Sequence, residues 1–150
     1  MRKESKVSSP KQILIWRSDL RNFNGQKVRS GKMAAQLAHA SLKAILDLGH
    51  YSDVYSHVSI DDEHFVLNID KNLALKEWME GKFAKICVSV NSEQELLDII
   101  QKAKDAGLIT SLITDAGLTE FNGVSTITCG AIGPAYPEQL DPITGHLPLL

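Results

Sequence analysis

The sequence lacks most of the features that mark secreted, membrane and disulfide-bonded proteins. Its 150 residues include two Cys, five Pro, four Phe, three Tyr and two Trp. Cys87 and Cys129 both lie in apolar runs, which favours buried small side chains over a disulfide or a metal pair. No apolar run approaches the roughly 20 residues of a membrane helix, and the first ten residues hold no signal-peptide core. We therefore expect one globular domain in the cytoplasm, without membrane association.

Several catalytic signatures are missing as well. The histidines show no metal-ligand spacing such as HExxH, no GxSxG elbow occurs, and neither cysteine has the features of a nucleophile. The segment GQKVRSGKM is only superficially similar to a nucleotide phosphate loop, because five residues separate Gly25 from Gly31 and Met33 follows Lys32. A thioether is a poor ligand for Mg²⁺. We expect neither a metal nor a cofactor.

What the sequence does contain is an uneven distribution of charge. The formal net charge is only -2, but residues 1–32 hold nine Lys and Arg side chains against two acidic ones. This asymmetry indicates an anionic partner near the amino-terminal half. Residues 1–10 on their own are typical of a disordered basic tail. We assign the folded domain to residues 11–150.

Hydrophobic periodicity predicts alternating strands and helices after that tail. Buried strands are expected at 12–18, 83–90, 108–114 and 124–132, and helices at 31–48, 72–81 and 91–107. Ser92 and Glu95 form a capping box for the last of these helices. Residues 49–70 allow a short helix, an ordered loop or an extra edge strand at 65–69.

These elements predict an α/β fold. The order strand, helix, strand over 83–114 implies parallel pairing through a right-handed crossover, with 83–90 as a central strand. The β-branched strand 124–132 is expected to pair antiparallel with its predecessor. Three prolines should break the segment that follows: Pro134, Pro137 and Pro142. The sum is a sheet of about four strands covered by helices.

The start of the first helix breaks a local rule. Ser30 is a good capping residue and Gly31 a permissive start, but Lys32 puts a cation in the first turn, where the helix macrodipole favours acids. A strand, a Gly-containing loop and a helix start with free N–H groups and a lysine together form an anion site. Gln36 and His39 share the Lys32 face, although each alone is typical of a solvated helix face.

Asp115 is the second candidate. It follows the predicted third strand at the carboxyl edge, where ligands of open α/β sheets gather. The same Asp followed by Gly117 also suits a tight turn, and both interpretations stay open. Thr126 and Thr128 share one face of the last strand, which β propensity alone explains. His146 lies in a TGH triplet that is either a site or a surface loop.

At these positions the chain resembles the archaeal and eukaryotic type (class II) of peptidyl-tRNA hydrolase. The matching segments follow the family's order over residues 13–147: RSDL, GKMAAQLAHA, DAGLT, TITCGAIGPA and DPITGHL. The resemblance implies a single three-layer α/β domain, with a four-stranded mixed sheet and helices on both faces, that forms a homodimer. It also implies an enzyme without metal or cofactor that hydrolyses the ester between a peptide and tRNA. This reaction recycles tRNA from stalled or prematurely released peptidyl-tRNA.

The resemblance also implies roles for individual residues. The family's catalytic residues fall on Lys32, Asp115 and Thr128. The substrate-binding candidates, some in matching motifs and some on the basic surface that would meet the tRNA backbone, are Asp19, Lys27, Arg29, Gln36, His39, Thr119 and His146. Lys32 could stabilise the oxyanion or hold a phosphate. Asp115 could orient Lys32 or accept a proton, and Thr128 could position the attacking water.

Some positions depart from the family pattern. Leu118 and Pro148 stand where basic residues are usual, Ala38 stands where serine is common, and the connection over 49–82 is longer. Two missing cations would weaken tRNA binding, which nearby basic residues could offset. The alternative function is a non-catalytic module that binds tRNA or another anion. A third, a protein-interaction adaptor, rests only on the length of 49–82.

Overall fold

The computed structural model describes residues 8–53 and 63–150. The helices are α1 (Ser30–Leu46), α2 (Leu73–Glu80), α3 (Glu93–Asp105) and α4 (Pro137–Thr144), with a short 3₁₀ helix η1 (Ile69–Lys71). The strands are β1 (Lys11–Arg17), β2 (His50–Asp53), β3 (Glu63–Val66), β4 (Ala84–Val90), β5 (Thr110–Asp115) and β6 (Thr126–Ala135). Residues 1–7 of the predicted tail lie outside the described part, whereas Pro10 is buried.

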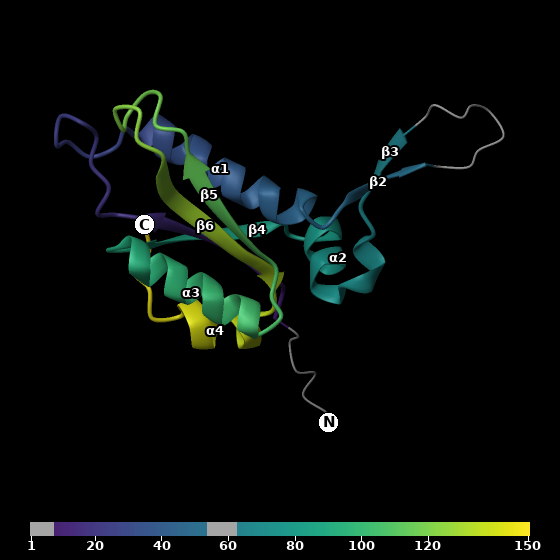
Figure 1. Ribbon diagram of the computed structural model, residues 1–150. Coiled ribbons are helices and arrows are strands. Elements are labelled where there is room, and N and C mark those ends of the chain that lie inside the picture. Colours follow the sequence, from purple (N-terminus) through teal and green to yellow (C-terminus); the bar gives the residue numbers. More distant parts are fainter. Residues whose placement is uncertain (1–7, 54–62) are drawn as a thin grey trace.

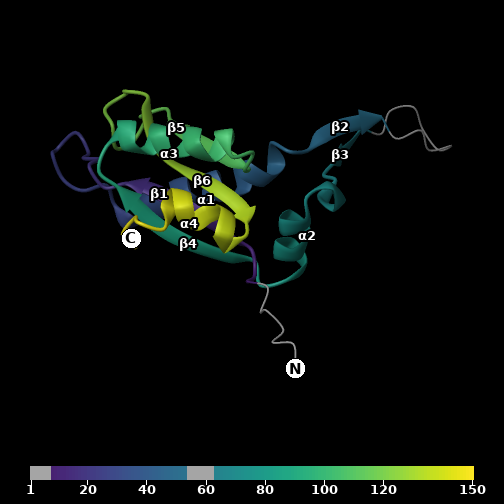
Figure 2. The same cartoon turned by 90° about the horizontal axis from the view of Figure 1, so that it is seen from below.

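Four strands form one mixed sheet in the order β4-β1-β6-β5. Strand β1 pairs parallel with β4 and antiparallel with β6, and β5 pairs antiparallel with β6. Helix α1 covers one face of this sheet, and α3 and α4 cover the other (Figures 1 and 2). The structure thus confirms the predicted three-layer α/β domain with a four-stranded mixed sheet and helices on both faces.

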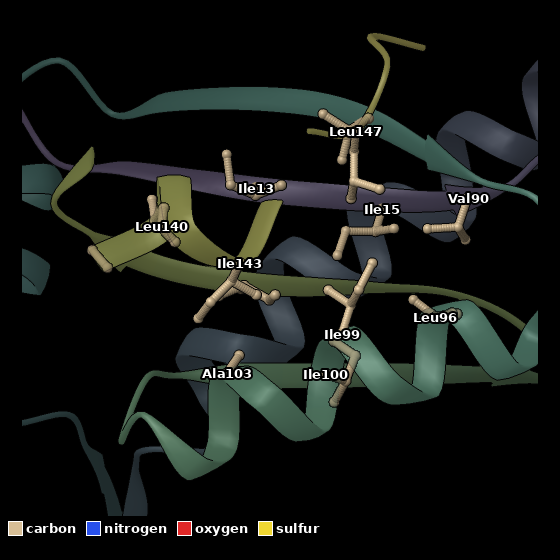
Figure 3. Close-up of a cluster of buried hydrophobic side chains, with 13 residues drawn as sticks. Ile13, Ile15, Val90, Leu96, Ile99, Ile100, Ala103, Leu140, Ile143 and Leu147 are labelled. Atoms are coloured by element: carbon tan, nitrogen blue, oxygen red, sulfur yellow. The ribbon is translucent and has the colours of Figure 1, made fainter. Parts of the chain in front are cut away.

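Strand β1 supplies side chains to both layers because successive residues of a strand face opposite sides. Ile13 and Ile15 pack toward α3 and α4, whereas Leu14 and Trp16 pack toward α1. Figure 3 shows the layer on the α3–α4 side, where the helices contribute Leu96, Ile99, Ile100, Leu140 and Ile143. Each such side chain contributes about 1.5 to 3 kcal/mol on full burial.

The α1 layer also buries polar groups. Gln12 is completely buried, and its amide donates to the carbonyl oxygens of Ser41 and Gly133, at 3.2 Å each. The Ser111 hydroxyl donates to the Ala40 carbonyl at 2.7 Å. Since an unpaired buried polar group costs free energy, these bonds fix how α1 sits on the sheet.

Strand β4 is an edge strand, so its prediction as a central strand is wrong. The carboxyl-terminal residues cover its outer edge: the Ser89 N–H donates to the Pro148 carbonyl and the Leu150 N–H to the Cys87 carbonyl, both at 3.0 Å. The predicted direct pairing of β4 with β5 is also wrong. These strands run in the same direction but lie at opposite edges, with β1 and β6 between them.

The three prolines after the last predicted strand do not break the chain, contrary to expectation. Pro134 lies inside β6, where the pairing with β1 shifts register between Lys11 and Ile13, and such an irregularity is a place where a strand tolerates proline. Pro137 opens α4, because the first helical position needs no N–H donor. Pro142 lies in the second turn of this short helix.

The described residues of segment 49–70 form two strands that pair with each other and do not join the main sheet. Strands β2 and β3 pair antiparallel in a separate two-stranded sheet that projects from the body of the molecule (Figure 1). The rings of Tyr51 and Phe65 pack edge to face across it, with centroids 5.4 Å apart. The predicted strand at 65–69 therefore ends at Val66, and residues 54–62 lie outside the described part.

Candidate active site

Helix α1 begins without a side-chain cap. Arg29, not Ser30, occupies the N-cap position, and it makes no side-chain capping bond, so the prediction of Ser30 as the cap is wrong. Met33 is the first residue whose N–H bonds back into the helix, to the Arg29 carbonyl at 3.0 Å. The first turn holds no acidic side chain. The N–H groups of the first three helical residues therefore point outward as a site for an anion.

Lys32 reaches from this first turn to Asp115 at the end of β5. Its Nζ donates to Asp115 Oδ1 at 2.7 Å, and the Gly117 N–H donates to Asp115 Oδ2 at 2.9 Å. Gly117 has a φ of +81°, and a Cβ there would lie 2.2 Å from the Val124 carbonyl oxygen. Only glycine fits this turn. The tight-turn and ligand-site interpretations of Asp115 are thus compatible.

Gln36 and Thr128 extend the cluster inward. Gln36 Nε2 donates to Asp115 Oδ1 at 3.3 Å, and the Thr128 hydroxyl donates to Gln36 Oε1 at 2.7 Å. Gln36 is 4% exposed and Thr128 is fully buried, so a solvated position for Gln36 is wrong. Thr128 thus contacts Asp115 only through Gln36. The Thr126 hydroxyl bonds instead to the Val124 carbonyl.

A β-bulge aims Thr128 at the helix. Along β6, Ile127 pairs with Thr114 and Cys129 pairs with Ile113, which leaves Thr128 as the extra residue of the ladder. Ile127 packs on the α3–α4 side, whereas Cys129 packs on the α1 side. The Cys129 thiol donates to the Gln36 backbone carbonyl at 3.3 Å. Both residues at the bulge therefore bond to Gln36.

The Lys32–Asp115 pair is shielded but open to the surface, with side chains 17% and 12% exposed. Burial acts to raise the pKa of Asp115. The hydrogen bonds from Lys32 and Gly117 and the charges of Lys32 and His39 outweigh that effect and hold this pKa below its ordinary value. Asp115 is therefore a carboxylate at neutral pH. It faces a lysine ammonium beside a helix N-terminus, which is an arrangement suited to negative charge that develops at a reacting carbonyl.

Known proteins are similar in sequence to this chain over most of its length. The family model described as "Peptidyl-tRNA hydrolase PTH2" matches residues 10–150. The chain belongs to the PTH2 family. It is 37% identical over 140 residues to a peptidyl-tRNA hydrolase of Methanocaldococcus jannaschii, which covers 93% of this chain and 99% of that protein. It is 39% identical over 141 residues to one of Methanothermobacter thermautotrophicus, again over 93% and 99% of the two chains.

Three further candidates of this PTH2 member lie on α1 or just before it. His39 is exposed on α1, one turn beyond Gln36, and Lys27 is exposed before α1. Arg29 is exposed and its guanidinium donates to the carboxylate of Glu120, which is 4% exposed. These three basic side chains border the start or the outer face of α1.

Three candidates do not join the cluster. Asp19 accepts two hydrogen bonds from the Arg17 guanidinium, at 3.1 and 2.7 Å, and so closes the end of β1. Thr119 is exposed in the loop after Asp115. His146 is exposed just after α4, the helix that lies on the other face of the sheet from α1. Their roles in substrate binding stay predictions.

Two polar groups near the site of this PTH2 member were not predicted from the sequence. The Gly117 N–H is a backbone donor, which only the turn signal Asp-x-Gly could have indicated. Glu120 is a buried acid inside an irregular loop, where no periodicity marks burial, and its Oε2 has no hydrogen-bond partner among the described residues. The Arg29 guanidinium beside it is the feature that marks Glu120 as part of this surface.

Both cysteines are unsuited to nucleophilic or disulfide chemistry in this fold. Burial raises the pKa of the Cys129 thiol to about 11, so it is a poor nucleophile, and Cys87 and Cys129 are both free thiols. Within residues 8–53 and 63–150, no group of three or more His, Cys, Asp or Glu side chains is placed to hold a metal ion. In the same part, no helix is long and apolar enough to cross a membrane.

Proposed function

We propose that this protein hydrolyses the ester bond between the peptide and the tRNA of peptidyl-tRNA. The proposal is carried by the contact of Lys32 Nζ with Asp115 at 2.7 Å beside the uncapped start of α1. In the reaction, water adds to the ester carbonyl carbon and the bond from that carbon to the ribose oxygen breaks. The ribose oxygen takes up a proton, and the peptide leaves as a carboxylate.

Lys32 supplies most of the electrostatic assistance. As the tetrahedral intermediate forms, negative charge develops on the former carbonyl oxygen, and a preorganised ammonium in a shielded site stabilises it without solvent reorganisation. Asp115 holds Lys32 in position from one side, and Gln36 bonds to the same carboxylate oxygen. This role accounts for a lysine in the first turn of α1, because negative charge develops on the reacting group there.

Asp115 is also a candidate general base, although its lowered pKa makes it a weak one. As a carboxylate at neutral pH it is available to accept a proton from the attacking water. A carboxylate whose pKa is lowered by Lys32 and Gly117 is a weak base, so we assign it first the orientation of Lys32 and only second the proton transfer.

Gln36 and Thr128 are positioning residues in this scheme. Thr128 is fully buried and bonds to Gln36 Oε1, which orients the Gln36 amide so that its Nε2 faces Asp115. Direct positioning of water by Thr128 does not suit this burial. The hydroxyl instead acts through Gln36 on the orientation of Asp115.

The tRNA end is held by charge. A surface hollow of about 610 Å³ is lined by Arg29, Ser30, Gly31 and Lys32, where free helix N–H groups meet two cationic side chains. A phosphate of the tRNA backbone suits such a site. Lys27 extends the positive surface, and it partly offsets the loss of a cation at Leu118, which is 87% exposed.

Two further properties rest on the resemblance to the family. Because ribosomes produce the substrate, we place the protein in the cytoplasm. We also propose a homodimer, and exposed apolar side chains such as Met79 and Phe83, 40% and 51% exposed, offer surface for such contacts. Sedimentation velocity at micromolar concentration tests the homodimer: a single species of monomer mass contradicts it.

The test of the activity is release of a labelled N-acyl amino acid from N-acyl-aminoacyl-tRNA, in the presence of a metal chelator. We expect release by the wild type and a fall of at least about 100-fold in kcat/KM for Asp115→Asn. Asp98→Asn, on the exposed face of α3, is the matched control and keeps wild-type release. A folded wild type that binds the tRNA without releasing the acyl group would contradict the proposal and favour the non-catalytic binding module.

A further inference from the structure

A groove lies beside the part of β5 that precedes Asp115. It has a volume of about 630 Å³ and runs between α1, which contributes residues from His39 to Asp47, and the last part of β5, from Leu112 to Thr114. Leu42 and Leu46 form part of its wall and are 59% and 44% exposed. The groove is thus an open surface hollow with both apolar and polar lining, and its size suits a small ligand or a few residues of peptide.

One side of this groove is the open edge of the sheet. Strand β5 is the last strand in the order β4-β1-β6-β5, and no other strand of the described residues pairs with its outer side. Figure 1 shows β5 at the edge of the sheet between α1 and α3. An unpaired edge presents N–H and C=O groups to any extended chain that lies beside it. The opposite edge, at β4, is closed by residues 148–150.

The lining of the groove includes residues that neighbour the site of the reaction on both α1 and β5. Thr114 adjoins Asp115 in the chain, and His39 lies one turn of α1 beyond Gln36. The peptide of the substrate is bonded to the reacting carbonyl, so it must leave the Lys32–Asp115 pair along the protein surface. Thr114 and His39 put one end of the groove next to the residues from which that peptide would extend.

We propose that the peptide part of the substrate binds in this groove as an added strand on the edge of β5. The inference rests on the proposed hydrolase function. With the carboxyl-terminal residue of the peptide at Asp115, its chain extends back toward Leu112, so it runs parallel to β5, which itself runs toward Asp115. The main chain of the peptide supplies the hydrogen bonds, and its side chains meet Leu42 and Leu46 without sequence selectivity.

The dimensions limit how much of the peptide is held. From His39 to Leu46 the helix advances by about 10 Å at about 1.5 Å per residue. An extended chain advances by about 3.3 Å per residue, so this length accommodates about three residues. Residues further from the ester lie beyond the groove and contribute little.

The experiment uses the full-length wild-type protein and tRNA acylated with N-acetylated peptides of one, four and eight residues. We expect kcat/KM to rise about tenfold from one residue to four and then to level off. A second series places a single N-methyl group at successive residues of the four-residue peptide. Because only every second residue of a strand turns its N–H toward one neighbour, N-methylation should lower kcat/KM at alternate positions.

A pair of variants tests the wall of the groove. Leu42→Asp should bring the ratio of kcat/KM for the four-residue and one-residue substrates close to one. Leu73→Asp, at an equally exposed leucine on α2 (64%), should keep the wild-type ratio. Equal kcat/KM values for all peptide lengths and all N-methyl positions would refute peptide binding in the groove. The proposed hydrolase function would still stand. No hydrolysis of any of these substrates by folded wild type would overturn the hydrolase itself.

Discussion

The two faces of the sheet are built on different principles. The α3–α4 side is an apolar core in which residues such as Ile15, Leu96 and Ile100 are almost fully buried. The α1 side buries polar groups as well, and five of them lie on α1 or bond to it: Gln12, Gln36, Ser41, Ser111 and Thr128. One face of the domain therefore contributes mainly stability, and the other also orients the reactive groups.

The sharpest test of this division is Lys32→Ala. Because Lys32 provides the charge for the developing oxyanion, we expect kcat/KM for N-acyl-aminoacyl-tRNA to fall by about 10² to 10³-fold. Gln36 and Gly117 still donate to Asp115, so the free energy of unfolding should fall by no more than about 2 kcal/mol. Urea unfolding and single-turnover kinetics measure the two effects. Lys102→Ala on α3 is the control, and wild-type rates for Lys32→Ala would refute the assigned role.

Ile100→Ala should show the opposite pattern. Ile100 is 2% exposed in the α3–α4 core, and its truncation leaves a cavity there. We expect the free energy of unfolding to fall by about 2 to 5 kcal/mol, with kcat/KM within about twofold of wild type while the protein is folded. Chemical denaturation with an activity assay at low temperature measures both. A large loss of activity in the folded variant would show that the two faces are not separable.

Thr128→Val probes the boundary between the two roles. Valine has nearly the shape of threonine but leaves Gln36 Oε1 without its donor. We expect a loss of about 1 to 2 kcal/mol in the free energy of unfolding and about tenfold in kcat/KM. Thr128→Ser keeps the hydroxyl and should recover most of the activity. If the serine variant is as slow as the valine variant, the methyl group matters and the bond to Gln36 does not.

The smallest effect concerns pH. The pKa of Asp115 lies below its ordinary value of 3.8 in the folded protein, so its charge stabilises the fold above that value. This contribution is lost as the pH falls through the lower, folded pKa. The difference in unfolding free energy between wild type and Asp115→Asn should therefore be constant from pH 7 to about 5 and shrink below pH 4. A difference that does not change down to pH 2 would contradict the lowered pKa.

The local pattern of the sequence was sufficient for most elements but not for their arrangement. The strands β1, β4, β5 and β6 and the helices α1, α2 and α3 lie close to their predicted positions. The edge position of β4 was not predictable, because the Pro148–Leu150 segment that shields it is far away in the sequence. An apolar run in the sequence indicates that a strand is buried. It does not tell whether a neighbouring strand or a covering segment buries it.

Some residues of the site were also predictable from the local sequence, and others were not. The position of Lys32 against the helix dipole and of Asp115 at a strand end both carried a signal in the sequence itself. Gln36 shares the Lys32 face of the helix, but only the family resemblance marked it as a site residue, because a glutamine on a helix face is usually solvated. In the structure it is buried and bonds to Asp115 and Thr128. Whether such a side chain is buried depends on contacts with segments some 80 residues away in the sequence. A local sequence pattern holds no information about those contacts.

The extra residue at Thr128 changes which side of the sheet the neighbouring residues of β6 face. In a regular strand, Ile127 and Cys129 would face the same side, but here they face opposite sides. The period-two pattern of β6 thus changes phase at one position, and that position holds the hydroxyl that orients Gln36. This change of side is visible in the pairing of β6 with β5 and not in the sequence, which is consistent with one regular strand. It marks where a strand gives up regular pairing to direct a side chain.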